Sequence, residues 1–187
     1  GTLLPLPNTR EIFTLNPDPD QSGGISFIWA NLSSTQREAL NRDPSDSTGA
    51  TVDSKGEERV SWLRGNQSAE RKNGGSFRNR SRVLGDIVNF NPVLVKADYF
   101  GYDRLPADAG GGDCTVSGRN ATNCYLEFYD DNRANRRAMV YVGANDGMLH
   151  AFDAETGVEK FAYVPKVLIP ELNQLTNPDY VHRYYVD

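Results

Sequence analysis

The sequence lacks the features that mark several common classes of protein. It has no long apolar run and no block of basic residues, and its formal net charge is −5 over 187 residues. A helix that spans a bilayer needs roughly 20 predominantly apolar residues. A surface that binds nucleic acid is usually rich in Lys and Arg. We therefore expect no transmembrane segment in this chain and no nucleic-acid partner.

The sequence motifs of common enzyme classes are also missing. There is no GxSxG nucleophile elbow, no HExxH zinc motif, no CxxC pair and no phosphate-binding loop. The two histidines are interpreted as structural. We expect His150 to be half-buried in a strand, and His182 to form hydrogen bonds within a cluster of tyrosines. The chain is therefore predicted to be no enzyme and to hold no catalytic cofactor.

Cysteine is scarce, and the two cysteines lie in one segment, GGDCTVSGRNATNC. Cys114 and Cys124 are separated by nine residues rich in Gly, Ser, Asn and Thr, which let the chain turn back into disulfide range. We predict a disulfide that closes this loop in an oxidising compartment. Two free thiols are the alternative, whereas half a zinc site lacks both CxxC spacing and a nearby His.

The composition predicts a mainly β protein with long loops. Hydrophobic residues make up 38% of the chain, which also contains 17 Gly and 10 Pro. Residues 98–124 form a long insertion, and the basic stretch 67–82 is interpreted as a solvated surface segment. The local patterns predict strands at 9–15 and 25–30 and two strands within 83–96. They predict a helix at 34–41 that opens with a capping box between Ser33 and Gln36, a helix at 57–64 that stops at Gly65, and one or two helical turns at 125–133.

The most regular part of the sequence is residues 139–165, MVYVGANDGMLHAFDAETGVEKFAYVP. Three apolar strands, at 139–143, 148–153 and 158–164, are separated by two glycine-containing turns. These strands predict an antiparallel meander. A meander alone exposes its edges and an apolar face, so we expect other elements to pack against it.

The second half of this stretch resembles the blade repeat of quinoprotein-type β-propellers. In that repeat Asp, Thr and Gly shape the turn, and a Trp docks between neighbouring blades. Phe161 stands in the Trp position here. The resemblance implies a partial, modified β-propeller with a few short helices. The residues that match the blade motif are Asp146, Gly147, Asp153, Thr156, Gly157 and Phe161.

A wider resemblance rests on four segments in order: WLRG at 62–65, RVLGDIVNFNPVLV at 82–95, MVYVGANDGMLHAFDAETG at 139–157 and PDYVHRYYVD at 178–187. Together they resemble the C-terminal domain of type IV pilus biogenesis factors and tip-associated adhesins of the PilY/PilC type. The resemblance implies that residues 1–187 are a single-domain fragment, the first part of a propeller.

The same resemblance implies a function without catalysis. Proteins of this family are exported to the pilus tip, outer membrane or cell surface. There they support pilus assembly against retraction, twitching motility and adhesion. The implied partners are pilins or minor pilins, and host-cell surface receptors. A fragment of a quinone-cofactor dehydrogenase, or a purely structural scaffold of the outer membrane, are the alternatives. We expect partner contacts in the loops at 43–56, 66–80 and 98–124.

Two further sites are implied by the family. Some members have an Asp-rich calcium loop before a helix that ends in an Arg-Gly-Asp tripeptide linked to integrin binding. The tripeptide falls on Arg64, Gly65 and Asn66, and the Asn removes the carboxylate that would reach an integrin's metal. The calcium loop falls at about 45–53, where serines and glycine replace most acids. Its candidate ligands are Asp43, Ser45, Ser47 and Asp53.

Overall fold

A six-stranded sheet forms the centre of the computed structural model, which describes residues 4–18, 20, 22–105 and 125–187. The order of the strands across the sheet is β2-β1-β6-β5-β4-β3. The β1–β6 pair is parallel, and the other neighbouring pairs are antiparallel. The strands are β1 (Ile12–Leu15), β2 (Gly24–Ser26), β3 (Val93–Val95), β4 (Met139–Ala144), β5 (Met148–Asp153) and β6 (Glu159–Val164).

Strands β3 to β6 form an antiparallel sheet of four strands that follow one another in the chain. This is the composition of one propeller blade. The meander predicted from the sequence is confirmed as β4, β5 and β6. Its fourth strand, β3, lies before the long insertion, and it is the only strand in 83–96, where the pattern predicted two.

The described helices begin and end near their predicted positions. Helix α1 (Ser34–Leu40) opens with a capping box between Ser33 and Gln36, and α2 (Gly56–Leu63) has acidic residues in its first turn. Helix α3 (Tyr125–Asn135) is longer than the turns expected there. The strand predicted at 25–30 is shorter, because a 3-10 turn, η1 (Trp29–Asn31), replaces its second half.

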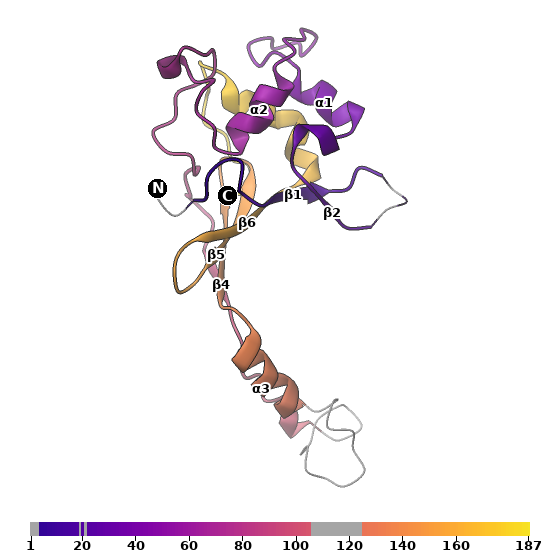
Figure 1. The fold of residues 1–187 in the computed structure, drawn as a ribbon, viewed down its shortest axis with the longest axis vertical. Coiled ribbons are helices and arrows are strands. Elements are labelled where there is room, and N and C mark those ends of the chain that lie inside the picture. Colours follow the sequence, from indigo (N-terminus) through magenta and orange to yellow (C-terminus); the bar gives the residue numbers. More distant parts are fainter. Residues whose placement is uncertain (1–3, 19, 21, 106–124) are drawn as a thin grey trace.

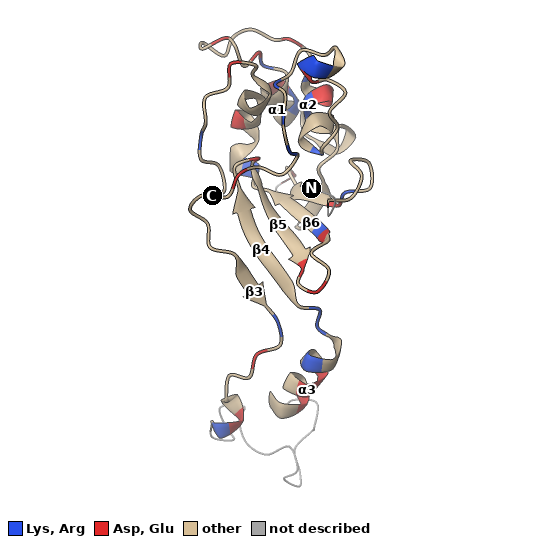
Figure 2. Cartoon of the chain, turned by 90° about the vertical axis from the view of Figure 1, so that its left-hand side faces the viewer, with Lys and Arg blue, Asp and Glu red and all other residues tan. Residues whose placement is uncertain are grey.

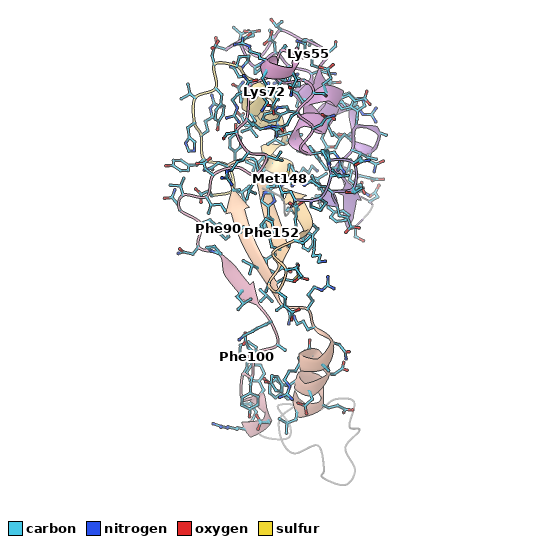
Figure 3. All side chains as sticks on the ribbon, turned by 60° about the vertical axis from the view of Figure 1, so that its left-hand side comes forward. Lys55, Lys72, Phe90, Phe100, Met148 and Phe152 are labelled. Carbon is cyan, nitrogen blue, oxygen red and sulfur yellow. The ribbon has the colours of Figure 1, made fainter. Side chains whose placement is uncertain are left out.

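The helices α1 and α2 gather at one end of the sheet, together with the 3-10 helix η6 (Lys166–Thr176), and the core lies between them and the strands (Figure 1). Met148 belongs to this core, whereas Phe100 is exposed and lies away from the helical end (Figure 3). The core combines β strands with the helical layer. Its largest apolar members are Ile12, Phe27, Leu40, Trp62, Met148, Ile169, Leu172 and Leu175.

The insertion between β3 and β4 leads away from the sheet as an arm that ends in α3 and the 3-10 turn η3 (Tyr102–Arg104) (Figures 1 and 2). Tyrosine rings hold the arm together, with Tyr99 and Tyr129 at a centroid distance of 5.4 Å. None of the residues of α3 is buried. Cys114 and Cys124 lie outside the described residues. No described helix is long and apolar enough to cross a bilayer.

Candidate binding site at the end of the sheet

A chain of buried charged side chains begins at Arg10, just before β1, and ends at the β4–β5 turn. Arg10 donates to both carboxylate oxygens of Glu159, from Nε and Nη2, each at 2.7 Å. Glu159 Oε1 lies 2.7 Å from His150 Nδ1. His150 Nε2 lies 3.1 Å from Asp146 Oδ1. The side chains of Arg10, His150 and Glu159 are at most 2% exposed, so water does little to screen these pairs.

The two carboxylates keep His150 protonated. Burial alone lowers the pKa of a histidine, but the charges and hydrogen bonds of Asp146 and Glu159 raise the pKa of His150 to about 9. Conversely, despite burial, hydrogen bonds and nearby charges hold the pKa of Asp146 and of Glu159 below the ordinary range. His150 is therefore fully buried and cationic at neutral pH, where the sequence predicted a half-buried histidine.

Asp146 also fixes the position of the segment that covers the turn. Its Oδ2 accepts a hydrogen bond from the backbone N–H of Gly85 at 2.9 Å. A Cβ on Gly85 would lie 2.4 Å from the backbone nitrogen of Asp146, so the contact requires a residue without a side chain. The segment around Gly85 thus packs directly on the β4–β5 turn.

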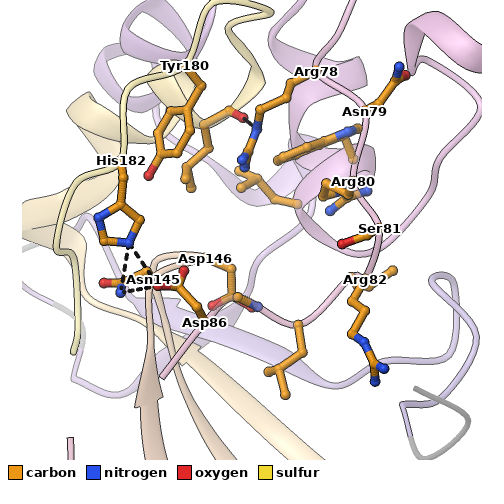
Figure 4. A pocket seen from close by; sticks show the side chains of 16 residues that line it. Arg78, Asn79, Arg80, Ser81, Arg82, Asp86, Asn145, Asp146, Tyr180 and His182 are labelled. Atoms are coloured by element: carbon orange, nitrogen blue, oxygen red, sulfur yellow. Dashed lines mark hydrogen bonds and ion pairs between the residues drawn. The ribbon is translucent and has the colours of Figure 1, made fainter. Parts of the chain in front are cut away.

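Beside this contact lies a cavity of about 360 Å³ (Figure 4). Its walls are the segment 78–86, the turn residues Asn145 and Asp146, and the tail residues Tyr180 and His182. Trp62 and Leu63 of α2, with Leu175 of η6, supply much of its apolar lining. Parts of the chain that are distant in sequence therefore form one concave surface.

His182 is one of the residues that line this cavity. Its Nε2 is 2.8 Å from Asp86 Oδ2, and Asn145 Nδ2 donates to the same oxygen at 3.3 Å. The sequence predicted a histidine hydrogen-bonded within a tyrosine cluster, and this prediction is wrong. His182 contacts the ring of Tyr184 edge-on, with centroids 5.2 Å apart, but its described hydrogen-bonding partners are Asp86 and Asn145.

The basic stretch 67–82 is less solvated than the sequence predicted. Arg80 is buried, and its Nε donates to Glu70 Oε1 at 2.9 Å. Its guanidinium lies 3.5 Å from the centroid of the Trp62 ring. Arg78 lies 4.1 Å from the centroid of Tyr180. No local pattern predicts these contacts, because the ring partners lie in other segments and Glu70 is a lone acid in a polar loop.

The matched residues of the blade motif shape the turns of the sheet. Asp153 Oδ1 accepts hydrogen bonds from the N–H groups of Glu155 and Thr156, both at 3.0 Å. Gly147 and Gly157 adopt positive φ angles of +89° and +70°. The ring of Phe161 contacts two aromatic neighbours edge-on, Phe13 of β1 and Tyr141 of β4, at centroid distances of 6.4 and 6.2 Å.

The calcium candidates do not come together as a ligand set. Asp43 Oδ1 accepts hydrogen bonds from the N–H and hydroxyl of Ser45, and Ser47 is exposed. Asp53 faces the guanidinium of Arg59 and pairs with it through both oxygens. Calcium takes six to eight oxygen ligands, and no metal-binding group of three or more His, Cys, Asp or Glu exists in the described part. These residues therefore do not fit a calcium ion.

The tripeptide at 64–66 forms the end of α2. Arg64 is the C-cap, and Gly65 follows it with a φ of +113°. The guanidinium of Arg64 donates to the backbone carbonyls of Arg10 at 2.7 Å and Phe27 at 3.2 Å. Asn66 donates to the hydroxyl of Ser61 at 3.1 Å. Arg64 therefore ties α2 to the N-terminal segment, and it is turned toward the protein.

Comparison with known proteins identifies the family. A family model described as the PilY1 beta-propeller domain matches residues 84–187. The chain is 41% identical, over 170 residues or 89% of its length, to the type IV pilus biogenesis factor PilY1 of Pseudomonas aeruginosa strain PAK. It is 42% identical over 130 residues, 70% of its length, to a PilY1 homolog of Xylella fastidiosa strain Temecula1.

The chain belongs to the PilY1 β-propeller family. The match to the Pseudomonas protein extends over the helical end as well as the blade, since it covers 89% of the chain. This chain spans only 13% of the length of that PilY1 protein and 10% of the Xylella homolog. No solved structure matches it. The predicted family and the predicted fold, a partial β-propeller with few helices, are confirmed.

Few local patterns in the sequence point to the buried charges of the site. One signal was present for Arg10: it precedes Ile12 and Thr14 at alternate positions, and the structure buries these residues on one face. The same alternation places His150 with Met148 on the buried face of β5. No comparable pattern points to Glu70 or to Asn145.

Proposed function

We propose that this chain is a non-enzymatic segment of an exported type IV pilus biogenesis factor. The observation that supports this role most strongly is the 41% identity to a protein named type IV pilus biogenesis factor PilY1, over 89% of the chain. By this proposal the whole protein acts at the pilus tip, outer membrane or cell surface. It supports pilus assembly against retraction, and with it twitching motility and adhesion.

The proposed partners are pilins or minor pilins, and host-cell surface receptors. The exposed aromatic side chains of the arm support a role in contacts, because aromatic residues are enriched in protein interfaces. Phe100 is 67% exposed and Phe128 is 62% exposed. The arm and the loops at 43–56 and 66–80 lie outside the strands of the blade, and loops are the usual position of binding residues.

The protonation state of His150 supports a function without catalysis. His150 is buried and already carries its proton between two carboxylates, so it is poorly suited to accept a proton from a substrate. The names of the relatives also favour a pilus factor over a quinone-cofactor dehydrogenase. A bound quinone spectrum in the purified protein would reverse that preference.

Deletion of this segment from the full-length protein tests the proposal. Cells that carry the shortened protein should display fewer surface pili and lose twitching, while the intact gene restores both. Normal piliation, with the shortened protein present at its usual level, would contradict the proposal. Co-purification with pilins separates a pilus factor from a purely structural outer-membrane scaffold, which would not retain pilins.

A further inference from the structure

The acids and the arginines that line the cavity beside the β4–β5 turn differ in their described partners. On the acidic side, Asp86 lies 2.8 Å from His182 Nε2, and Asp146 pairs with the protonated His150. On the basic side, Arg80 is paired with Glu70, whereas Arg78 and Arg82 have no carboxylate partner among the described residues. The electrostatic potential of the cavity is therefore positive beside Arg78 and Arg82, where a ligand would contact these side chains.

The guanidinium of Arg78 is held in an orientation that suits the binding of an anion. Its Nε donates to the backbone carbonyl of Leu175 at 3.0 Å, and its guanidinium lies over the ring of Tyr180, beside which Figure 4 shows it. Both contacts fix the plane of the guanidinium, and no described hydrogen bond uses its two Nη atoms. A guanidinium held in this way presents a fork that matches two oxygens of an oxyanion.

The partial burial of Arg78 makes its interaction with a bound anion more favourable. The side chain is half-buried, and this loss of water lowers the pKa of Arg78, although the group stays charged at neutral pH. Because the guanidinium has lost hydration and forms no ion pair with a described carboxylate, pairing with an anion restores part of the lost stabilisation.

We propose that this cavity binds a carboxylate carried on an apolar stem, with Arg78 as its principal contact and Arg82 as a second positive charge at the wall. The apolar lining from Leu63 and Leu175 suits a hydrocarbon stem. Phosphate is a poorer match than a carboxylate, because it brings a second negative charge close to Asp86 and Asp146, which line the same cavity. A volume of about 360 Å³ is at the small end of ligand cavities and fits a side chain or chain end rather than a folded partner.

The carboxylate can come from an acidic side chain or from the C-terminus of a polypeptide. The two sources are distinguished by titrating the isotope-labelled chain with capped peptides and following the indole N–H signals by NMR. Acetyl-Leu-Glu-amide carries a side-chain carboxylate, and acetyl-Gly-Leu carries a terminal one. The neutral controls are acetyl-Leu-Gln-amide and acetyl-Gly-Leu-amide, and inorganic phosphate tests the other class of anion.

The two tryptophans give the experiment an internal reference. Trp62 lines the cavity, whereas Trp29 lies elsewhere with Arg37 over its ring. At least one carboxylate peptide should shift the Trp62 signal saturably at millimolar concentration, and Trp29 should not move. Equal shifts with the neutral peptides, tighter binding of phosphate, or no shift with either carboxylate would each overturn the proposal.

Variants of the arginines test which side chain contacts the carboxylate. Arg78→Gln should weaken peptide binding on the order of tenfold, and Arg78→Lys should restore part of it, since Lys keeps the charge but not the fork. Arg82→Gln changes an exposed side chain without described bonds, so the fold is kept, and binding should weaken by a smaller factor. Arg71→Gln, in an exposed part of the same loop, is the control. Unchanged affinity in both Arg78→Gln and Arg82→Gln would contradict the proposal. The ligand preference of the cavity does not depend on the role in pilus assembly.

Discussion

Arg10 and Glu159 form a bidentate ion pair next to the parallel contact between β1 and β6, although 149 positions separate them in the chain. The same carboxylate also binds His150 at 2.7 Å. Glu159 therefore holds the N-terminal segment and the blade to one another through two buried cations.

Removing the charge of Glu159 should strongly destabilise the protein. In Glu159→Gln, Arg10 and the protonated His150 remain buried without their shared carboxylate, which typically costs about 3 to 5 kcal/mol of the free energy of unfolding. Urea unfolding of the chain measures this change. Glu155→Gln, an exposed acid in the neighbouring turn, should change stability by less than about 0.5 kcal/mol. Equal effects of the two substitutions would contradict the account of the ion pair.

The protonation of His150 makes stability depend on pH. Its pKa is raised from 6.5 to about 9 in the folded protein, so folding favours the protonated form. This contribution is complete below about pH 6.5 and is lost as the pH rises through about 9. The free energy of unfolding should therefore fall between these values, and His150→Gln should flatten that decline. A curve of wild-type slope in the variant would show that another group is responsible.

The Arg80–Glu70 pair provides an independent test of the helical end. Arg80→Gln leaves Glu70 buried with Lys72 as its remaining described cation, and Lys72 is partly exposed. We expect a loss of about 3 kcal/mol on urea unfolding, together with a change in the fluorescence of Trp62. Arg71→Gln should remain within about 0.5 kcal/mol of the wild type. A similarly small change in Arg80→Gln would mean that the pair adds nothing to stability.

The loop at 43–53 is expected not to bind calcium. Asp53 is already neutralised by Arg59, and Asp43 is engaged by Ser45. Calorimetric titration of the chain with calcium should show no saturable heat that depends on this loop. Binding that disappears in Asp43→Asn, with the fold intact, would contradict this expectation.

The predicted Cys114–Cys124 disulfide is tested by intact mass after alkylation, with and without reductant. The oxidised protein should take up alkylating reagent at both cysteines only after reduction. Uptake at both cysteines without reductant would favour two free thiols.

The sequence predicted those features that short patterns determine. The turns at Gly147 and Gly157, the meander, the capping box at Ser33 and the end of α2 at Gly65 all depend on a few adjacent residues, and each appears in the structure. The features it missed depend on contacts between distant segments. Strand β3 pairs with β4 across the whole insertion, so no local pattern connects them.

Charged residues were the main source of error for the site. A basic stretch such as 67–82 looks the same in sequence whether its arginines face water or aromatic rings. Only the fold brings Trp62 and Tyr180 beside Arg80 and Arg78. Likewise, His150 was expected to be half-buried because the sequence does not show that Asp146 and Glu159 supply two carboxylates around it.

The most direct test asks whether the buried ion pairs of Glu159 are needed for the proposed role in piliation. Full-length protein carrying Glu159→Gln or Glu155→Gln is produced in cells that lack the native gene, and sheared surface pilin is quantified against total pilin. We expect a marked loss of surface pili with Glu159→Gln and wild-type piliation with Glu155→Gln. Full piliation in cells where the Glu159→Gln protein is present and its blade is shown to be unfolded would contradict the claim that this segment supports pilus assembly.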